Sequence, residues 1–129
     1  MSKPKKIIYM PELFRLEKEE FSKVDNEYQW TYLCLFEFIF KKRFIKRITI
    51  TDHAWKKKGR EWMTKELVLN ILTKELNGRK RMRFHKKYGN REVYIREYVP
   101  YKDRFYHLTF WFEDNNSDWL WVRNCYPIS

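Results

Sequence analysis

The chain has 129 residues, of which 43% are hydrophobic and 19% aromatic, so it can bury a core and lacks the aromatic-poor composition of a disordered chain. Its formal net charge of +11 favours an anionic partner, such as nucleic acid or a membrane surface. The charge is concentrated in residues 41–104, which contain 21 Lys or Arg against 7 Asp or Glu. We therefore expect this central segment to bind phosphate groups.

Composition also argues against several classes of protein. Cys34 and Cys125 are the only cysteines, and no Cys or His spacing typical of a zinc site occurs, so we expect no metal and no cofactor. The two could pair, but no apolar stretch typical of a secretory signal follows the N-terminal lysines. The longest apolar-rich run, residues 28–40, is shorter than the roughly 20 residues that cross a membrane. A single soluble, cytoplasmic domain over residues 1–129, with no membrane partner, is the expectation.

Residues 1–45 are predicted to form a helical N-terminal extension. Pro11 suits the first turn of a helix over residues 11–24. Asn26 and Gln29 resemble a capping box that would open a second helix over residues 27–43. This second helix would be apolar nearly all round from Trp30 to Phe40, which is typical of a helix that is buried or presented to a partner.

Residues 46–129 are predicted to form the core of the domain. Ile48 and Ile50 alternate with polar residues and indicate a short strand, after which Asp52 could cap a turn of helix ending near Gly59. Thr64 caps the clearest helix, which Asn77 and Gly78 terminate. Four strands follow, over residues 79–88, 91–99, 105–112 and 119–128. The predicted fold is α+β: N-terminal helices, then a helix packed on a four- to five-stranded, mainly antiparallel sheet.

Alternation along these four strands predicts two different faces. One is apolar and would face the core, with Met82, Phe84, Val93, Ile95, Leu108, Phe110, Phe112, Leu120 and Val122. The other mixes bases and aromatics: Arg81, Arg83, His85, Tyr94, Arg96, Tyr98, His107, Thr109, Trp111, Trp121 and Arg123. Such a mixture suits single-stranded nucleic acid, because phosphates contact the charges and bases stack on the rings. Alternatively, the N-terminal helices cover this second face and its arginines reach solvent at the rim.

His53 directly follows the first predicted strand. If Asp52 caps a helical turn, then His53, Lys57 and Arg60 fall on one helix face. A histidine base and nearby cations are what RNA cleavage by the adjacent 2′-hydroxyl needs, without any metal. A hydrogen-bonded structural histidine beside solvated lysines is the competing interpretation.

The pattern "ITITDHAWKKKGREWMTKELVLNIL", followed by basic strands and a terminal "VRNCYPI", resembles the RelE-like superfamily of small ribonuclease toxins, in particular BrnT-type proteins and their phage relatives. The resemblance covers about residues 46–128. It implies a RelE-like core and an active region containing His53, Lys57 and Arg60, with Arg96, Arg123 and Tyr126 from the sheet. The alternation of the strands adds His107. In many members of the family the arginine follows the histidine more closely. In this chain Lys56 to Lys58 lie between His53 and Arg60.

Together these observations predict a metal-independent, toxin-type endoribonuclease. His53 would be the general base and His107 or Tyr126 the proton donor, and Lys57, Arg60, Arg96 and Arg123 would stabilise the transition state. RNA would be held by Arg81, Arg83, His85, Tyr94, Arg96, Trp111 and Trp121. An acidic antitoxin or immunity protein is a further expected partner, and the chain could be a monomer or a homodimer. The alternatives are a non-catalytic RNA- or DNA-binding module, or a phage or host interaction protein that docks through residues 30–40.

Overall fold

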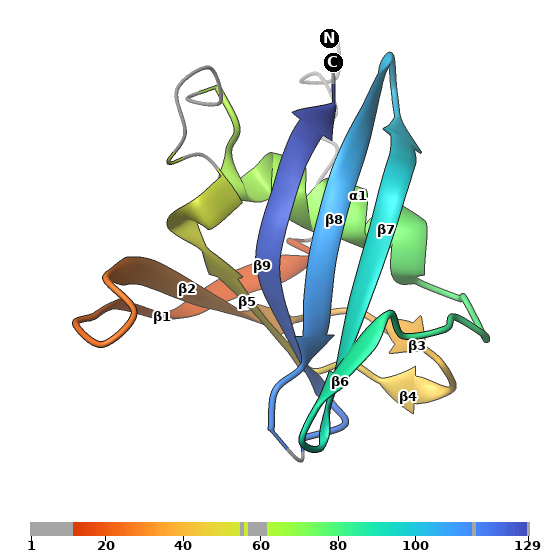
Figure 1. Ribbon diagram of the computed structural model, residues 1–129, viewed down its shortest axis with the longest axis horizontal. Coiled ribbons are helices and arrows are strands. Elements are labelled where there is room, and N and C mark those ends of the chain that lie inside the picture. The colour runs from red at the N-terminus through yellow and green to blue at the C-terminus, as the bar shows by residue number, and fades with distance from the viewer. Residues whose placement is uncertain (1–11, 55, 57–61, 115, 129) are drawn as a thin grey trace, which may run out of the picture.

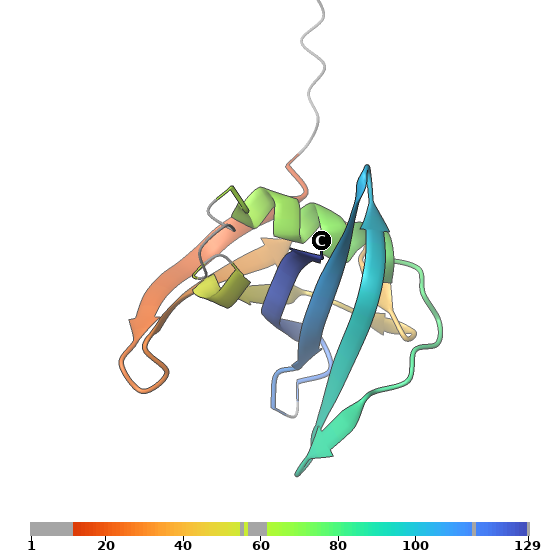
Figure 2. The same ribbon diagram turned by 45° about the horizontal axis from the view of Figure 1, so that its top comes forward.

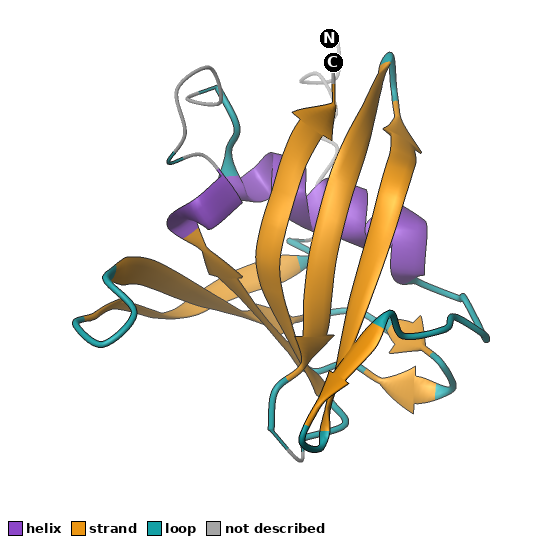
Figure 3. Ribbon diagram, in the orientation of Figure 1, coloured by secondary structure: helices purple, strands orange, loops and turns teal. Residues whose placement is uncertain are grey.

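The structure, a computed structural model, describes residues 12–54, 56, 62–114 and 116–128. The described residues form mostly sheet, with 54% of them in strands and one α-helix among them (Figure 3). A seven-stranded mixed sheet has the order β1-β2-β5-β9-β8-β7-β6, and β3 pairs with β4 in a separate hairpin. The strands are β1 (Phe14–Ser22), β2 (Glu27–Cys34), β3 (Ile39–Phe40), β4 (Arg43–Phe44), β5 (Arg47–Thr51), β6 (Lys86–Tyr88), β7 (Arg91–Tyr101), β8 (Arg104–Phe112) and β9 (Trp119–Ile128). A 3₁₀ turn, η1 (Asp52–Ala54), and the helix α1 (Lys65–Leu76) lie between β5 and β6.

The predicted fold of N-terminal helices on a smaller sheet is wrong. Residues 14–34 form the β1–β2 hairpin, which pairs with β5 and so continues the same sheet (Figure 1). Asn26 does not cap a helix: its φ is +51°, and with Asp25 it belongs to the hairpin turn. The overlooked pattern is the period of two in β2, where aromatic Tyr28, Trp30 and Tyr32 alternate with polar residues. Residues 30–40 therefore form no docking helix.

Several elements predicted for the middle and end of the chain are confirmed, whereas the end of the helical turn predicted to stop near Gly59 lies outside the described residues. β5 coincides with the predicted strand, and the Thr64 hydroxyl accepts a hydrogen bond from the Leu67 amide at the start of α1, at 3.1 Å. Gly78, with φ +86°, follows the end of α1. Strands β6 to β9 form the predicted antiparallel meander, although β6 is shorter than expected. The crossover through α1 allows β5 and β9 to pair in parallel.

The core lies between α1 and one face of the curved sheet (Figures 1 and 2). Side chains from α1 pack there against both halves of the sheet. The buried side chains of this core include Val68, Ile71 and Leu72 from the helix, Ile48 and Ile50 from β5, and Leu108, Phe110, Leu120 and Val122 from β8 and β9. This face is called the helix face below, and its reverse is called the outer face.

The outer face is polar near its centre. The hydroxyls of Thr31 and Thr49 lie 2.8 Å apart, and the Trp119 indole donates a hydrogen bond to Thr49, also at 2.8 Å. Both threonines are buried, so these bonds satisfy groups that would otherwise be costly to desolvate.

No α-helix in the described part of the chain is long and apolar enough to cross a membrane.

Candidate nucleic-acid interface

His53 lies in η1 and is held by a buried carboxylate at the start of β2. Its Nε2 is 2.8 Å from Oε1 of Glu27, whose side chain is only 3% exposed. Gln29 donates a hydrogen bond to the other Glu27 oxygen at 3.0 Å. A carboxylate that orients an imidazole is a common arrangement around a general base. It is also a sufficient structural reason for a histidine at this position. Lys57 and Arg60 lie outside the described residues.

The sheet supplies a second group of predicted catalytic residues. His107 of β8 faces Tyr126 of β9, and their rings stack with centroids 4.9 Å apart. His107 Nε2 is also 3.1 Å from the Thr109 hydroxyl. Arg123 is exposed, and its backbone carbonyl accepts a hydrogen bond from Thr51 of β5 at 3.1 Å. Because η1 contacts both β2 and β9, the His53 and Tyr126 groups lie toward the same end of the sheet.

The predicted basic and aromatic face does not form as one surface. Tyr94 pairs with Phe110 and lies fully buried in the core, and Arg96 pairs with Leu108 and reaches Glu75 of α1 at 2.9 Å. Both therefore occupy the helix face. Trp111 pairs with Trp121 on the outer face and is 9% exposed. The guanidinium of Arg91 covers it, 4.8 Å from the centroid of the Trp111 ring. Val93 and Ile95, predicted as core, pair with Trp111 and Thr109 and so belong to the outer face.

Arg81, Arg83 and His85 are exposed, but they lie in the segment that leads into β6 and not on a strand face as predicted. Phe84, predicted as core, is exposed in the same segment. This segment lies beside the β3–β4 hairpin, because the amide of Lys41 donates to the Arg79 carbonyl at 2.8 Å and that of Gly78 to the Ile39 carbonyl at 2.7 Å. Figure 1 shows β3, β4 and β6 gathered at one corner of the molecule. The exposed cations there that have no acidic partner among the described residues are called the basic edge: Lys42, Arg43, Lys80, Arg81, Arg83, Lys86 and Lys87.

Aromatic side chains are interleaved with the basic edge. Phe84 is 42% exposed and Tyr88 is 58% exposed, and the Lys86 ammonium lies 4.9 Å from the Tyr88 ring. Lysines on an edge strand also prevent two sheets from pairing edge to edge. Protection of the edge explains the lysines but not the exposed aromatic rings. A surface that binds single-stranded nucleic acid uses both cations and aromatic rings.

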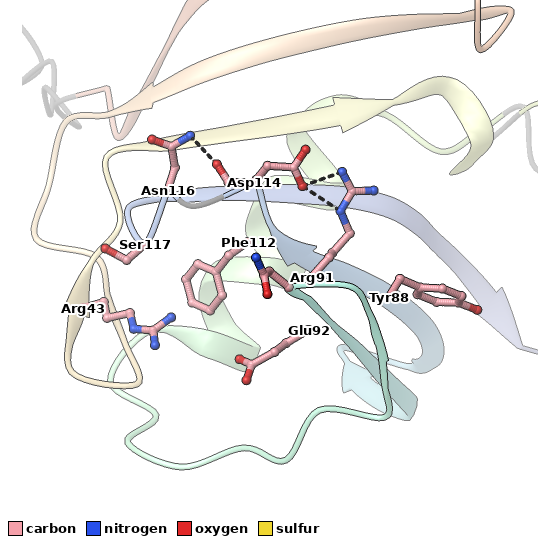
Figure 4. Close-up of a pocket in the computed structure, with 9 residues that line it drawn as sticks. Arg43, Tyr88, Arg91, Glu92, Phe112, Asp114, Asn116 and Ser117 are labelled. Atoms are coloured by element: carbon pink, nitrogen blue, oxygen red, sulfur yellow. Dashed lines mark hydrogen bonds and ion pairs between the residues drawn. The ribbon is translucent and has the colours of Figure 1, made fainter.

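A pocket of about 670 Å³ opens beside the basic edge, between β4, the β6–β7 turn and the β8–β9 loop. Figure 4 shows Arg43 and Glu92 on either side of the Phe112 ring, with Ser117 above Arg43 and Asn116 at the top of the view beside Asp114. The Arg43 guanidinium lies 4.6 Å from the centroid of Phe112. Arg91 closes one wall through a two-nitrogen contact with Asp114, at 2.8 and 3.1 Å. The volume falls within the range of about 300–1,000 Å³ that is usual for small-ligand sites.

A chain of hydrogen bonds orients Glu92 at the rim of this pocket. The Lys41 ammonium donates to the Tyr94 hydroxyl at 2.6 Å, and that hydroxyl donates to Oε1 of Glu92 at 3.2 Å. Burial, together with the Glu92 carboxylate, raises the pKa of Tyr94 well above its ordinary value of 10.0, so Tyr94 remains a donor. Lys41 and Lys42 have φ of +52° and +65°, the conformation of a two-residue hairpin turn that Lys rarely adopts.

Sequence reasoning missed Glu27, Arg43, Glu92 and Asn116. Glu27 and Arg43 lie at the two ends of the predicted second helix, which does not form, and Asn116 lies between two predicted strands. Glu92 carried no spacing that linked it to residues 50 positions away. Of these features of the interface, only the basic residues after Gly78 could be identified from the sequence, because their charge is visible there.

Two further findings bear on the interface. Among the described residues, no group of three or more His, Cys, Asp or Glu side chains is arranged to hold a metal ion. The chain matches no protein-family model, no curated protein and no solved structure.

Proposed function

We propose that this protein binds single-stranded RNA along the basic edge. The observation that carries the proposal is the run of exposed, unpaired cations from Lys80 to Lys87, extended by Lys42 and Arg43 and interleaved with Phe84 and Tyr88. Phosphates contact cations at this spacing and bases stack on the rings, at about 1–3 kcal/mol per stacked base. The choice of RNA over DNA is supported by the resemblance of residues 46–128 to small ribonuclease toxins.

Binding is tested with a labelled 12-nucleotide RNA by fluorescence anisotropy at several salt concentrations. If five edge cations contact phosphates, the slope of log K against log salt is about −3.5, from about 0.7 per contact on a single strand. The double variant Lys86→Gln, Lys87→Gln should reduce that slope by about 1.4 and weaken binding. Single-stranded DNA and double-stranded RNA of the same length serve as comparison ligands.

The matched control is Lys18→Gln, Lys23→Gln, which removes the same charge from β1 and its turn at the opposite edge of the sheet. It should bind RNA nearly as the wild type does. Equal losses in the two double variants would mean that RNA responds only to total charge, and the basic edge would lose its role. A slope near zero would contradict RNA binding altogether.

Metal-independent RNA cleavage is the second candidate, and the His53–Glu27 contact favours it. His53 would take the proton of the 2′-hydroxyl, the 2′-oxygen would bond to phosphorus as the P–O5′ bond breaks, and His107 or Tyr126 would protonate the leaving 5′-oxygen. RNA binding comes first because Phe112, beside the basic edge, and His107 point to opposite faces of β8. They are five residues apart, or roughly 17 Å. One RNA strand would have to cross the edge of the sheet to contact both the basic edge and His107.

Cleavage is tested with a mixed-sequence RNA and its 2′-deoxy copy, using wild type, His53→Ala, Glu27→Gln and Glu19→Gln. A ribonuclease should cut only the RNA, leave a 2′,3′-cyclic phosphate, and lose activity in His53→Ala and Glu27→Gln. Glu19→Gln is the control, because it neutralises an exposed carboxylate of β1 to which no role in binding or cleavage is assigned. Unchanged cutting in both His53→Ala and Glu27→Gln would exclude this site.

A further inference from the structure

The pocket beside the basic edge has the properties of a site for a neutral, planar, polar ligand. Its four charged lining residues cancel, Arg43 and Arg91 against Glu92 and Asp114. Arg91 and Asp114 neutralise each other by direct contact. Because the lining of the pocket has no net charge, the pocket attracts an anion less than the basic edge beside it does, so an uncharged nucleobase suits the pocket better than a phosphate group.

The pocket also offers the contacts that hold a base. The exposed Arg43 guanidinium is a flat cation supported from below by Phe112, and bases stack well on such planes. Asn116 uses its amide nitrogen to donate to the Asp114 carbonyl at 2.9 Å, which leaves its Oδ1 as an acceptor. The Ser117 hydroxyl lines the same side. Lys86 and Lys87, at the adjoining strand β6, are placed to hold the phosphates of the same nucleotide chain.

Glu92 decides which base fits. Oε1 accepts one hydrogen bond from Tyr94, and the carboxylate has lone pairs left to accept from a ligand. Guanine presents two neighbouring donors, N1–H and N2–H₂, on its Watson–Crick edge. Adenine and cytosine each present a ring acceptor beside their single amino group, and that acceptor would repel the carboxylate.

We infer that this pocket binds one guanine base of the RNA strand, with Glu92 accepting from N1–H and N2–H₂ and Arg43 stacking on the ring. The inference rests on the RNA binding proposed above and adds a base preference to it. Tyr94 is a positioning residue in this site, because it orients Glu92 without reaching the ligand.

The test compares 12-nucleotide oligouridylates that carry one central guanine, adenine or inosine, or none. We expect the guanine strand to bind about tenfold tighter than the adenine strand, with inosine, which lacks the N2 amine, in between. Glu92→Gln should bring the ratio of the guanine-strand affinity to the adenine-strand affinity close to one, and this ratio is not affected by the loss of one negative charge. Glu97→Gln is the matched control, since Glu97 is an exposed carboxylate on the same strand, outside the pocket.

The possible failures are distinguishable. If oligouridylate binds but guanine adds nothing, the base pocket is refuted and RNA binding stands. If no strand binds, RNA binding is refuted, and a titration with GMP and AMP followed by ¹H–¹⁵N spectra judges the pocket alone. Amide shifts at Glu92, Phe112 and Ser117 with GMP only would keep it as a guanine nucleotide site; their absence would overturn that as well.

Discussion

Glu75 joins α1 to the sheet and to the segment that becomes the basic edge. Its carboxylate, 8% exposed, contacts Arg96 of β7 at 2.9 Å and Arg79 at 3.3 Å. Replacing Glu75 by Ala leaves two arginines beside the core without their anion. We therefore expect Glu75→Ala to destabilise the fold while leaving the charge of the basic edge intact.

The size of the effect follows from the exposure of the two arginines. Hydrogen bonds to buried charged groups contribute about 1.5–3 kcal/mol each, and fully exposed ion pairs about 0–1 kcal/mol. Arg79 and Arg96 are 39% and 40% exposed, so solvent screens each contact substantially. About 1 kcal/mol for each contact gives a loss of about 2 kcal/mol in the free energy of unfolding.

Urea unfolding followed by circular dichroism measures this loss, with Glu66→Ala as the control on an exposed position of α1. The control should change stability by less than about 0.5 kcal/mol. A double-mutant cycle with Arg96→Ala should give a coupling energy of about 1 kcal/mol. A loss in Glu75→Ala no larger than in the control, or a coupling near zero, would refute the argument that these contacts tie the helix to β7.

Three further outcomes follow from buried groups and backbone geometry. Burial raises the pKa of Cys34 and of Cys125 to about 12, so neither thiol should react with an aromatic disulfide reagent at pH 8 until the protein is unfolded in guanidinium. Because folded Cys34 and Cys125 hold their protons more tightly than the unfolded chain does, where the ordinary thiol pKa is 9.0, the two thiols should not change stability below pH 9. Between pH 9 and pH 12 each should lower stability by about 1.4 kcal/mol per pH unit, or about 2.8 kcal/mol per pH unit together. Urea unfolding at pH 8 to 11 would show this slope, and Cys125→Ala should reduce it; a flat profile would contradict it. Gly78→Ala meets no atom within 4 Å, so its expected cost of about 1 kcal/mol comes from φ +86° alone, and Gly78→Asn should lower the melting temperature less.

Part of the interface could be predicted from the sequence because it depends only on neighbouring residues. The charge of residues 79–87 needs no partner to be exposed, and the Thr64 cap and Gly78 stop act within one turn of α1. The faces of β7 could not be predicted in the same way. In "REVYIREYV" the apolar Val93 and Ile95 lie on one face of the strand and the aromatic Tyr94 on the other, so either face could be buried. The pairing of Tyr94 with Phe110 decides that the face of Tyr94 packs in the core. A shift of one residue in that register would exchange every side chain between the faces.

Three features could be read from the amino-acid sequence: the position of the charge, the capped helix after a short strand, and the antiparallel meander at the end of the chain. These features arise from local periodicity, capping and turn residues. Three other features depend on contacts between distant parts of the chain: the hairpin over residues 14–34, the contact of Glu27 with His53, and the pocket lined by Arg43, Glu92 and Asn116. The reason is physical: strands are stabilised by partners distant in sequence, so an amphipathic segment such as β1 becomes helix or strand according to what it can pair with.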